Sequence, residues 1–285
     1  MSGRAPRDAR GFLIPRWLGV SLTILLVVVL AIGAGIWGAV RAPVLASYDI
    51  RLPNWPAGVP PLRIVQLSDS HANTRFMPAS RLQALVRRVN ALRPDIVVLT
   101  GDYAGDGVLG TEPLPPDQAV APFAGLKARL GVYAVLGNHD HLFQFGEIKA
   151  ALDRAHVRLL NNHHTRVGPV MIAGIDDWNV GRPDLRRALY AIDPARPTIL
   201  LSHTPDIFPR VDSRVGLTLA GHTHGGQIAP PLIGPILTAS VYGKRYVHGH
   251  VVENGHDLIV SAGLGTSVLP MRIGVPPEIV LVTLH

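Results

Sequence analysis

Five short apolar runs divide the chain, and each ends at a turn that carries carboxylate, amide or imidazole side chains. The runs are Ile64–Leu67, Ile96–Leu99, Val132–Leu136, Ile199–Leu201 and Leu217–Ala220. Continuous apolar runs of this length are typical of parallel strands that are buried on both faces. Sites in α/β folds lie at the carboxyl ends of such strands. The sequence therefore predicts an α/β fold in which polar side chains from distant segments converge.

The polar fragments after these runs are rich in groups that bind divalent metal ions. They are Asp69-Ser70-His71, Gly101-Asp102, Gly137-Asn138-His139-Asp140, His203 and Gly221-His222-Thr223-His224. A single Asp or His at a strand end is usually a turn or cap residue, but a whole ordered set favours a metal centre. The chain contains no cysteine, so its ligands must be oxygen and nitrogen. The pattern predicts a two-metal phosphoesterase.

In this order the fragments resemble the signature of the calcineurin-like metallophosphoesterases, which reads D-x-H, G-D, G-N-H-D, H and G-H-x-H. The phrases from Gly131 to Asp140 and from Gly221 to Gln227 are similar to the branch whose members carry an N-terminal membrane segment. Ser70 departs from the family, which more often has an apolar residue there. The resemblance extends over 62–285 and implies two packed, mixed β-sheets flanked by helices, preceded here by one transmembrane helix.

The resemblance also assigns seven residues to two divalent metal ions. One ion is expected on Asp69, His71, Asp102 and His224, and the other on Asp102, Asn138, His203 and His222. A carboxylate suits the shared position because its two oxygens can serve two cations. Mixed nitrogen and oxygen ligands favour Mn²⁺, Fe or Zn²⁺ over Ca²⁺ or Mg²⁺, and manganese is one candidate among these.

Two catalytic residues are expected beside the metals. Two close cations lower the pKa of a bridging water, so no protein nucleophile is required. His139 follows a predicted ligand without being one, and it is the candidate to stabilise the phosphoryl group and protonate the leaving oxygen. Asp140 is expected either to orient His139 or to cap the turn.

An uncharged stretch of 24 residues, Trp17 to Val40, predicts a membrane anchor. At about 1.5 Å per residue, a helix of this length crosses a hydrocarbon layer about 30 Å thick. A buried core helix would rarely run so long without a charge. A cleaved signal peptide is the second alternative, because Val44-Leu45-Ala46 resembles a cleavage site, although its apolar region would normally be shorter.

Four arginines precede this stretch and two follow it closely. They are Arg4, Arg7, Arg10 and Arg16 before, and Arg41 and Arg51 after. Because the more basic flank stays cytoplasmic, the catalytic domain is expected outside the cell membrane. The predicted organisation is a basic flank over 1–16, a transmembrane helix over 17–40, a Pro-rich tether with one short strand over 41–61, and a metallophosphoesterase domain over 62–285.

Apolar spacing within the domain predicts further elements. Helices are expected at 82–92 after an N-cap near Ser80, and at 119–130, 147–155 and 184–190. Strands at 170–173, 258–260 and 279–284 are expected to form a second, mixed sheet, with a loop over 110–122 near the site. Residues 176–178 are interpreted as a loop, with substrate contact as the alternative.

The partners expected are a membrane and a phosphorylated small molecule or lipid. The net charge of +7 lies largely in the N-terminal arginines, and the domain has no basic run that would indicate nucleic acid. This disfavours a nuclease, and the residues after Asp102 differ from those of protein serine/threonine phosphatases. Phosphodiester or pyrophosphate hydrolysis is favoured, with UDP-2,3-diacylglucosamine as one candidate substrate. That substrate is cytoplasmic, which conflicts with the expected orientation. A phosphate-binding module without turnover is the alternative, and the oligomeric state is not predicted.

Overall fold

The computed structural model describes residues 16–105 and 107–285, and the chain falls into two compact units, 1–34 and 35–285. Apart from Arg16, the predicted basic flank lies outside the described residues. Helix α1 (Arg16–Val40) buries only Gly35 and Ala39 along its length. It is long and apolar enough to cross a membrane, and its exposed apolar surface is unlike that of a core helix.

The first sheet has six strands. Their order is β1 (Val44–Ile50), β12 (Glu278–Leu284), β2 (Leu62–Leu67), β3 (Ile96–Leu99), β4 (Val132–Ala134) and β5 (Arg158–Leu159). Strands β2 to β5 are parallel, with Ile64 paired to Ile96 and Val97 to Val132. Strand β12 runs parallel to β1 and antiparallel to β2, so the sheet is mixed.

The second sheet also has six strands and is also mixed. Their order is β10 (Gly249–Glu253), β11 (His256–Val260), β9 (Leu217–Ala220), β8 (Thr198–Leu201), β7 (Val170–Gly174) and β6 (His163–Val167). The four central strands are parallel, and the two outer pairs are antiparallel. Four-residue apolar runs such as Leu217–Ala220 are buried throughout, as expected for central strands.

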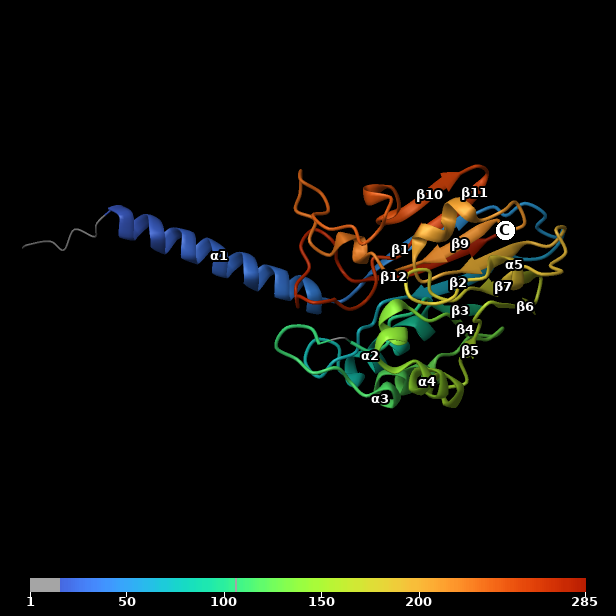
Figure 1. Ribbon diagram of the computed structural model, residues 1–285, viewed down its shortest axis with the longest axis horizontal. Helices are drawn as coiled ribbons and strands as arrows, with labels where there is room; N and C mark the ends of the chain where they lie inside the picture. Colours follow the sequence, from blue (N-terminus) through green and yellow to red (C-terminus); the bar gives the residue numbers. More distant parts are fainter. Residues whose placement is uncertain (1–15, 106) are drawn as a thin grey trace, which may run out of the picture. The chain divides into compact units, whose positions relative to one another are not determined.

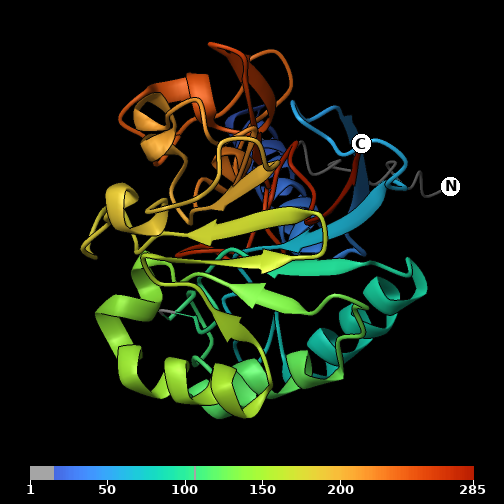
Figure 2. The same cartoon turned by 90° about the vertical axis from the view of Figure 1, so that its right-hand side faces the viewer.

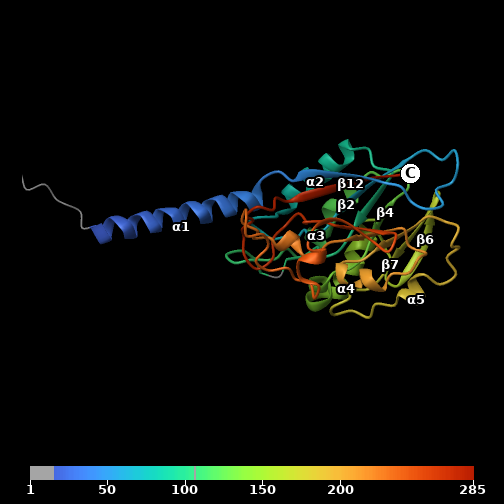
Figure 3. The same cartoon turned by 90° about the horizontal axis from the view of Figure 1, so that it is seen from above.

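The two sheets pack face to face, with helices outside the first sheet (Figure 2). One apolar cluster fills the space between the sheets and includes Ile64, Val98, Ile199 and Leu219. A second cluster includes side chains of α2 (Ala79–Ala91), α3 (Pro116–Val120) and α4 (Asn138–Arg154), the helices labelled in Figures 1 and 3. The shorter elements are α5 (Leu185–Ala188) and the 3₁₀ turns η1 (Ala121–Gly125), η2 (Pro205–Arg210), η3 (His224–Gly226) and η4 (Gly243–Tyr246). The predicted fold class is confirmed.

Several elements differ from the sequence prediction. Strand β12, expected in the second sheet, lies in the first, where Val282 pairs with Ile64. The helix expected over 119–130 is instead α3 followed by η1, because Pro122 lacks an N–H and interrupts the α-helical hydrogen bonds. Part of the loop expected over 110–122 is therefore helical.

Helices α2, α4 and α5 begin or end at residues other than those predicted. Helix α2 begins one residue before Ser80 and takes Pro78 as its N-cap. Helix α4 begins at Asn138, well before residue 147, and α5 ends at Ala188. The early start of α4 places Asn138 and His139 in its first turn, which fixes their backbone beside the site.

The segment 41–61, expected as a Pro-rich tether with one short strand, contains one strand, which belongs to the first sheet. Its residues Val44–Ile50 form β1, and their full length is paired with β12. Arg88 donates to the carbonyl of Pro43, and the Leu52 N–H donates to the carbonyl of His285. Only residues 41–43 therefore connect α1 to the first sheet.

Candidate metal centre

The predicted ligands lie directly after the central strands of both sheets. Asp69 and Asp102 follow β2 and β3, while His203 and His222 follow β8 and β9. The backbone is in the left-handed region at several of these residues, where non-glycine side chains are uncommon. They are Asp69 (φ 53°), His71 (41°), Asp102 (57°), His222 (72°) and His224 (51°). Such a cluster of strained residues is characteristic of functional sites.

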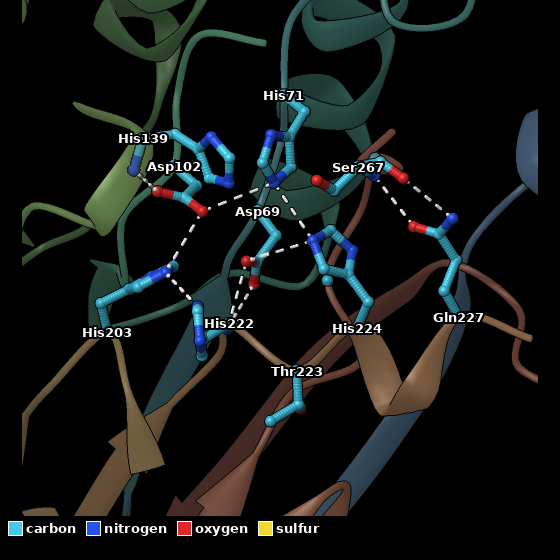
Figure 4. A network of polar contacts seen from close by, with 12 residues as sticks. Asp69, His71, Asp102, His139, His203, His222, Thr223, His224, Gln227 and Ser267 are labelled. Carbon is cyan, nitrogen blue, oxygen red and sulfur yellow. Dashed lines mark hydrogen bonds and ion pairs between the residues drawn. The ribbon is translucent and has the colours of Figure 1, made fainter. Parts of the chain in front are cut away.

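One buried group of ligand atoms comes from Asp69, His71 and His224, whose ligand atoms all lie within 4.8 Å of one another. Nε2 of His71 is 3.1 Å from Nε2 of His224, which is 3.6 Å from Oδ1 of Asp69 (Figure 4). The His222 N–H donates to both oxygens of Asp69 and holds the carboxylate in place. Two imidazoles and a carboxylate in this arrangement suit a transition-metal ion.

A second group comes from Asp102, His203 and His222, with the amide of Asn138 beside it. Nδ1 of His203 lies 2.7 Å from the carbonyl oxygen of Thr100, so this nitrogen carries the proton. The other ring nitrogen, Nε2, is 3.0 Å from Oδ1 of Asn138 and 3.1 Å from Nδ1 of His222. In the tautomers that leave these two nitrogens unprotonated, their lone pairs and the amide oxygen converge and favour a positive charge among them. The donor set therefore fits a cation.

Asp102 joins the two groups through one oxygen. Its Oδ2 is 3.2 Å from Nε2 of His203 and 3.5 Å from Nε2 of His71. Its Oδ1 accepts the backbone N–H of His139 at 3.0 Å. The structure thus brings the predicted residues together in the two predicted groups, with Asp102 between them. That they bind metal ions stays a prediction.

Electrostatics at the centre favour a positive charge. Burial would lower the pKa of His203, but the Asp102 carboxylate outweighs it and raises this pKa well above its usual value. Burial would raise the pKa of Asp102, but His203 and the neighbouring histidines lower it well below its usual range. Burial, partly offset by His203, raises the pKa of Asp69 to about 6. Burial also lowers the pKa of His222 to about 4. Because neutral imidazoles and ionised carboxylates are the forms that bind metals, a cation bound here would take the place of the proton that Asp102 favours on His203.

The predicted catalytic residues take different positions. The ring of His139 meets that of His71 edge-on, 5.0 Å between centroids, and lines a cavity of about 350 Å³ together with Asp102 and His222. Asp140 is buried, and its oxygens accept backbone N–H groups of Gly137, Asp102 and Tyr103. These contacts agree with the turn-capping alternative for Asp140, which also holds the segment at Asp102.

The match to known proteins covers the residues that form this centre. A family model described as calcineurin-like phosphoesterase matches residues 62–226. The chain belongs to the calcineurin-like metallophosphoesterases. The resemblance inferred from the sequence is thus confirmed, and with it a metal-dependent phosphoester hydrolase. The family generally uses two divalent metals, in agreement with the two ligand groups.

Some of the similar proteins are named as transmembrane proteins and others are not. An uncharacterized metallophosphoesterase, YkuE, of Bacillus subtilis is 33% identical over 80% of this chain and 81% of its own length. A transmembrane protein with metallophosphoesterase domain of Bos taurus is 31% identical over 91% of this chain and 61% of its own. Among solved structures, a 5'-nucleotidase precursor from Thermus thermophilus has a TM-score of 0.43 and 16% identity, covering 78% of this chain and 55% of that one.

Three residues beside this metallophosphoesterase centre were not found from the sequence. The Asn179 amide lies 3.2 Å from Nε2 of His222, and Arg272 lies 3.2 Å from Nδ1 of His224. The Gln227 side-chain amide donates to the carbonyl of Ser267 and accepts the N–H of the same residue. Asn179 and Arg272 come from loops without a local motif. Gln227 alone had a signal, because it ends the phrase that marks the membrane-associated branch.

Glycines in the motifs allow the ligand segments to approach closely. A Cβ at Gly137 would overlap Oδ1 of Asp102 and lie 2.8 Å from its Cγ. We therefore expect Gly137→Ala to displace Asp102 and reduce turnover by about 10²-fold or more, because a 1 Å misplacement can cost that much. Metal content should fall with it, measured by elemental analysis of the purified protein.

Gly146, within the helix α4 that Gly137 caps, is the matched control. A Cβ there would meet no atom within 4 Å, and its backbone is not left-handed. Gly146→Ala is expected to keep both turnover and metal content and to stabilise the fold by about 0.5–1 kcal/mol. Equal activity in the two alanine variants would contradict the close-approach explanation.

Proposed function

We propose that this chain is a membrane-anchored phosphoesterase that hydrolyses phosphodiester or pyrophosphate bonds at a binuclear metal centre. The observation that carries the proposal is the position of Asp102 Oδ2, within 3.5 Å of one imidazole from each ligand group. A single oxygen shared in this way suits two adjacent cations. The oxygen and nitrogen donor set favours Mn²⁺, Fe or Zn²⁺.

The metal ions, when bound, would lower the pKa of a water and polarise the phosphoryl group. In the proposal, one ion is held by Asp69, His71, Asp102 and His224, and the other by Asp102, Asn138, His203 and His222. The carbonyl of Thr100 orients His203 by accepting its Nδ1 proton. The backbone of His139 is fixed by Asp102, so its ring stays at the cavity wall, where it can donate a proton to the leaving oxygen.

We also propose that α1 anchors the protein and is not cleaved. The possible cleavage site, Val44-Leu45-Ala46, forms the first part of β1 and pairs with Glu278–Val280. Cleavage there would remove strand residues whose backbone groups are hydrogen-bonded in the sheet. The apolar length of α1 and the transmembrane name of a relative support anchoring.

The catalytic domain is proposed to face away from the cytoplasm, since more arginines precede the span than follow it. A fusion of alkaline phosphatase after Val44 is accordingly expected to be active in bacterial cells. The same fusion to a cytoplasmic reporter is expected to be inactive. The opposite result would reverse the orientation and make UDP-2,3-diacylglucosamine accessible.

The natural substrate is proposed to be a lipid-linked phosphodiester or pyrophosphate. The cavity that reaches Asp102 and His139 has mainly apolar walls, including Ile236, Leu237 and Leu269. Apolar walls beside a phosphoryl site suit a substrate with a hydrocarbon group. A nucleotide-linked lipid remains one candidate within this class.

Turnover of bis-p-nitrophenyl phosphate by the full-length protein tests the reaction. We expect hydrolysis that is lost on treatment with EDTA and restored by Mn²⁺, Fe²⁺ or Zn²⁺. Binding of phosphate without turnover under all three metals would indicate the binding module instead.

A further inference from the structure

Exposed aliphatic side chains are concentrated in the loops 230–242 and 266–275, which supply Ile236, Leu237 and Val268 to the wall of the cavity. They are Leu232, Ile233, Ile236, Leu237, Val241 and Val268. Leu237, for example, is 77% exposed and Val241 is 80% exposed. We call these six residues the apolar mouth. Contiguous exposed apolar surface on a folded domain usually marks an interaction site.

Hydrogen bonds hold the loops of the apolar mouth together. The Leu109 N–H donates to the carbonyl of Val268, and the Ile236 N–H donates to the carbonyl of Ile228. The Gln227 amide donates to the carbonyls of Ser267 and Leu269. In Figures 1 and 3 the orange and dark red loops, 230–242 and 266–275, gather at one end of the domain.

The apolar mouth is continuous with the metal centre. The cavity of about 350 Å³ is lined on its outer side by Ile236, Leu237 and Val268, and on its inner side by Asp102 and His139. A hydrocarbon chain bound along the outer wall would therefore place its phosphate among the predicted metal ligands.

Chain connectivity identifies what covers this surface. The last turns of α1 belong to the domain, where the Gly35 carbonyl accepts the N–H of Arg272 at 2.8 Å, and a Cβ added at Gly38 would overlap the carbonyl oxygen of Arg272. Arg272 is four residues from Val268. Because the chain continues from Gly35 directly into the apolar span, a bilayer that holds α1 would begin within a few residues of Gly35, which is hydrogen-bonded to the segment that carries Val268.

The composition of the apolar mouth also favours lipid over protein. The exposed large hydrophobic residues of its two loops are all aliphatic except Tyr242, whereas protein interfaces are enriched in aromatic residues and arginine. Lys244 lies at its edge and donates to the carbonyl of Ile233. A lysine at the border of an aliphatic surface suits anionic lipid headgroups.

We propose that the apolar mouth is a second membrane-contact surface, which dips into the bilayer that holds α1 and admits the hydrocarbon chain of the substrate to the metal centre. Docking is inferred from the exposed apolar surface alone, whereas the entry of substrate rests on the proposed function. Once docked, the enzyme takes amphipathic phosphoesters from the membrane plane.

The absence of cysteine from the chain allows docking to be measured directly. Full-length Ile233→Cys and Val241→Cys would each carry one nitroxide spin label in nanodiscs of phosphatidylethanolamine and phosphatidylglycerol. Val252→Cys, on β10 and 61% exposed, is the control. We expect the labels at 233 and 241 to be accessible to oxygen and shielded from a water-soluble nickel complex, with the reverse at 252. Equal nickel accessibility at all three positions would overturn docking.

Substrate entry is tested with Ile233→Asp against Val252→Asp, each reconstituted as the full-length protein. The measured quantity is the ratio of two rates, on a vesicle-embedded isoprenoid pyrophosphate and on bis-p-nitrophenyl phosphate. We expect this ratio to fall by about tenfold or more in Ile233→Asp only, because burial of one such side chain is worth at least that factor. An equal ratio in both variants would overturn substrate entry. Failure of the unmodified protein on both substrates would instead reject the proposed function, while the spin-label result would still decide docking.

Discussion

Asp102→Ala is expected to abolish metal binding and turnover together. The substitution removes the one oxygen that lies near imidazoles of both ligand groups. Loss of an outer-shell partner typically costs about 10–100-fold in metal affinity or activity, so loss of a shared ligand should exceed about 10²-fold. The measurements are metal content by elemental analysis and initial rates on bis-p-nitrophenyl phosphate over a range of added Mn²⁺.

Asp102→Asn separates the charge from the hydrogen bond. Its amide oxygen can still accept the N–H of His139, so the first turn of α4 should keep its position. The variant lacks the negative charge that holds the pKa of His203 high, and it should lose metal much as the alanine variant does. Retention of the full metal content and rate in both variants would disprove the bridging role.

The buried strands of the fold could be predicted because their signal is local. Runs such as Ile96–Leu99 are apolar at every position, and β3 matches its predicted range. The position of β12 could not be predicted, because its partners β1 and β2 lie more than two hundred residues earlier in the chain. Strand β1 was difficult to recognise in the sequence, because only Ile50 of its residues is buried and prolines flank it on both sides.

Part of the candidate centre could likewise be predicted from the sequence, and part of it could not. Its ordered motifs predicted which residues would meet, since each motif follows a strand whose position is locally determined. Asp140 is expected from the sequence either to orient His139 or to cap its turn. The cap to Gly137 is local, whereas its hydrogen bonds to Asp102 and Tyr103 join a distant segment that no local pattern indicates. Asn179 and Arg272 reach the centre from loops whose paths depend on tertiary packing, so no local pattern indicated them.

His139→Ala is expected to slow hydrolysis without removing metal. His139 belongs to neither ligand group, and alanine keeps the backbone N–H that binds Oδ1 of Asp102. Loss of a positioned general acid typically costs about 10²–10⁴-fold in rate. The cost should be largest for phosphodiesters with alkyl leaving groups and smallest for nitrophenyl esters, since a nitrophenolate leaves without protonation. A plot of rate against leaving-group pKa should therefore be steeper for the variant.

His141→Ala provides the matched control for this plot. His141 lies in the same helix, two residues further along, and its Nε2 is 2.6 Å from the Asp176 carboxylate, which raises the pKa of the imidazole. Its removal breaks a hydrogen bond to the loop after β7, but it should leave the leaving-group dependence unchanged. If His139→Ala lost metal, or slowed all esters by the same factor, proton donation by His139 would be ruled out, because only a general acid distinguishes leaving groups by their need for a proton.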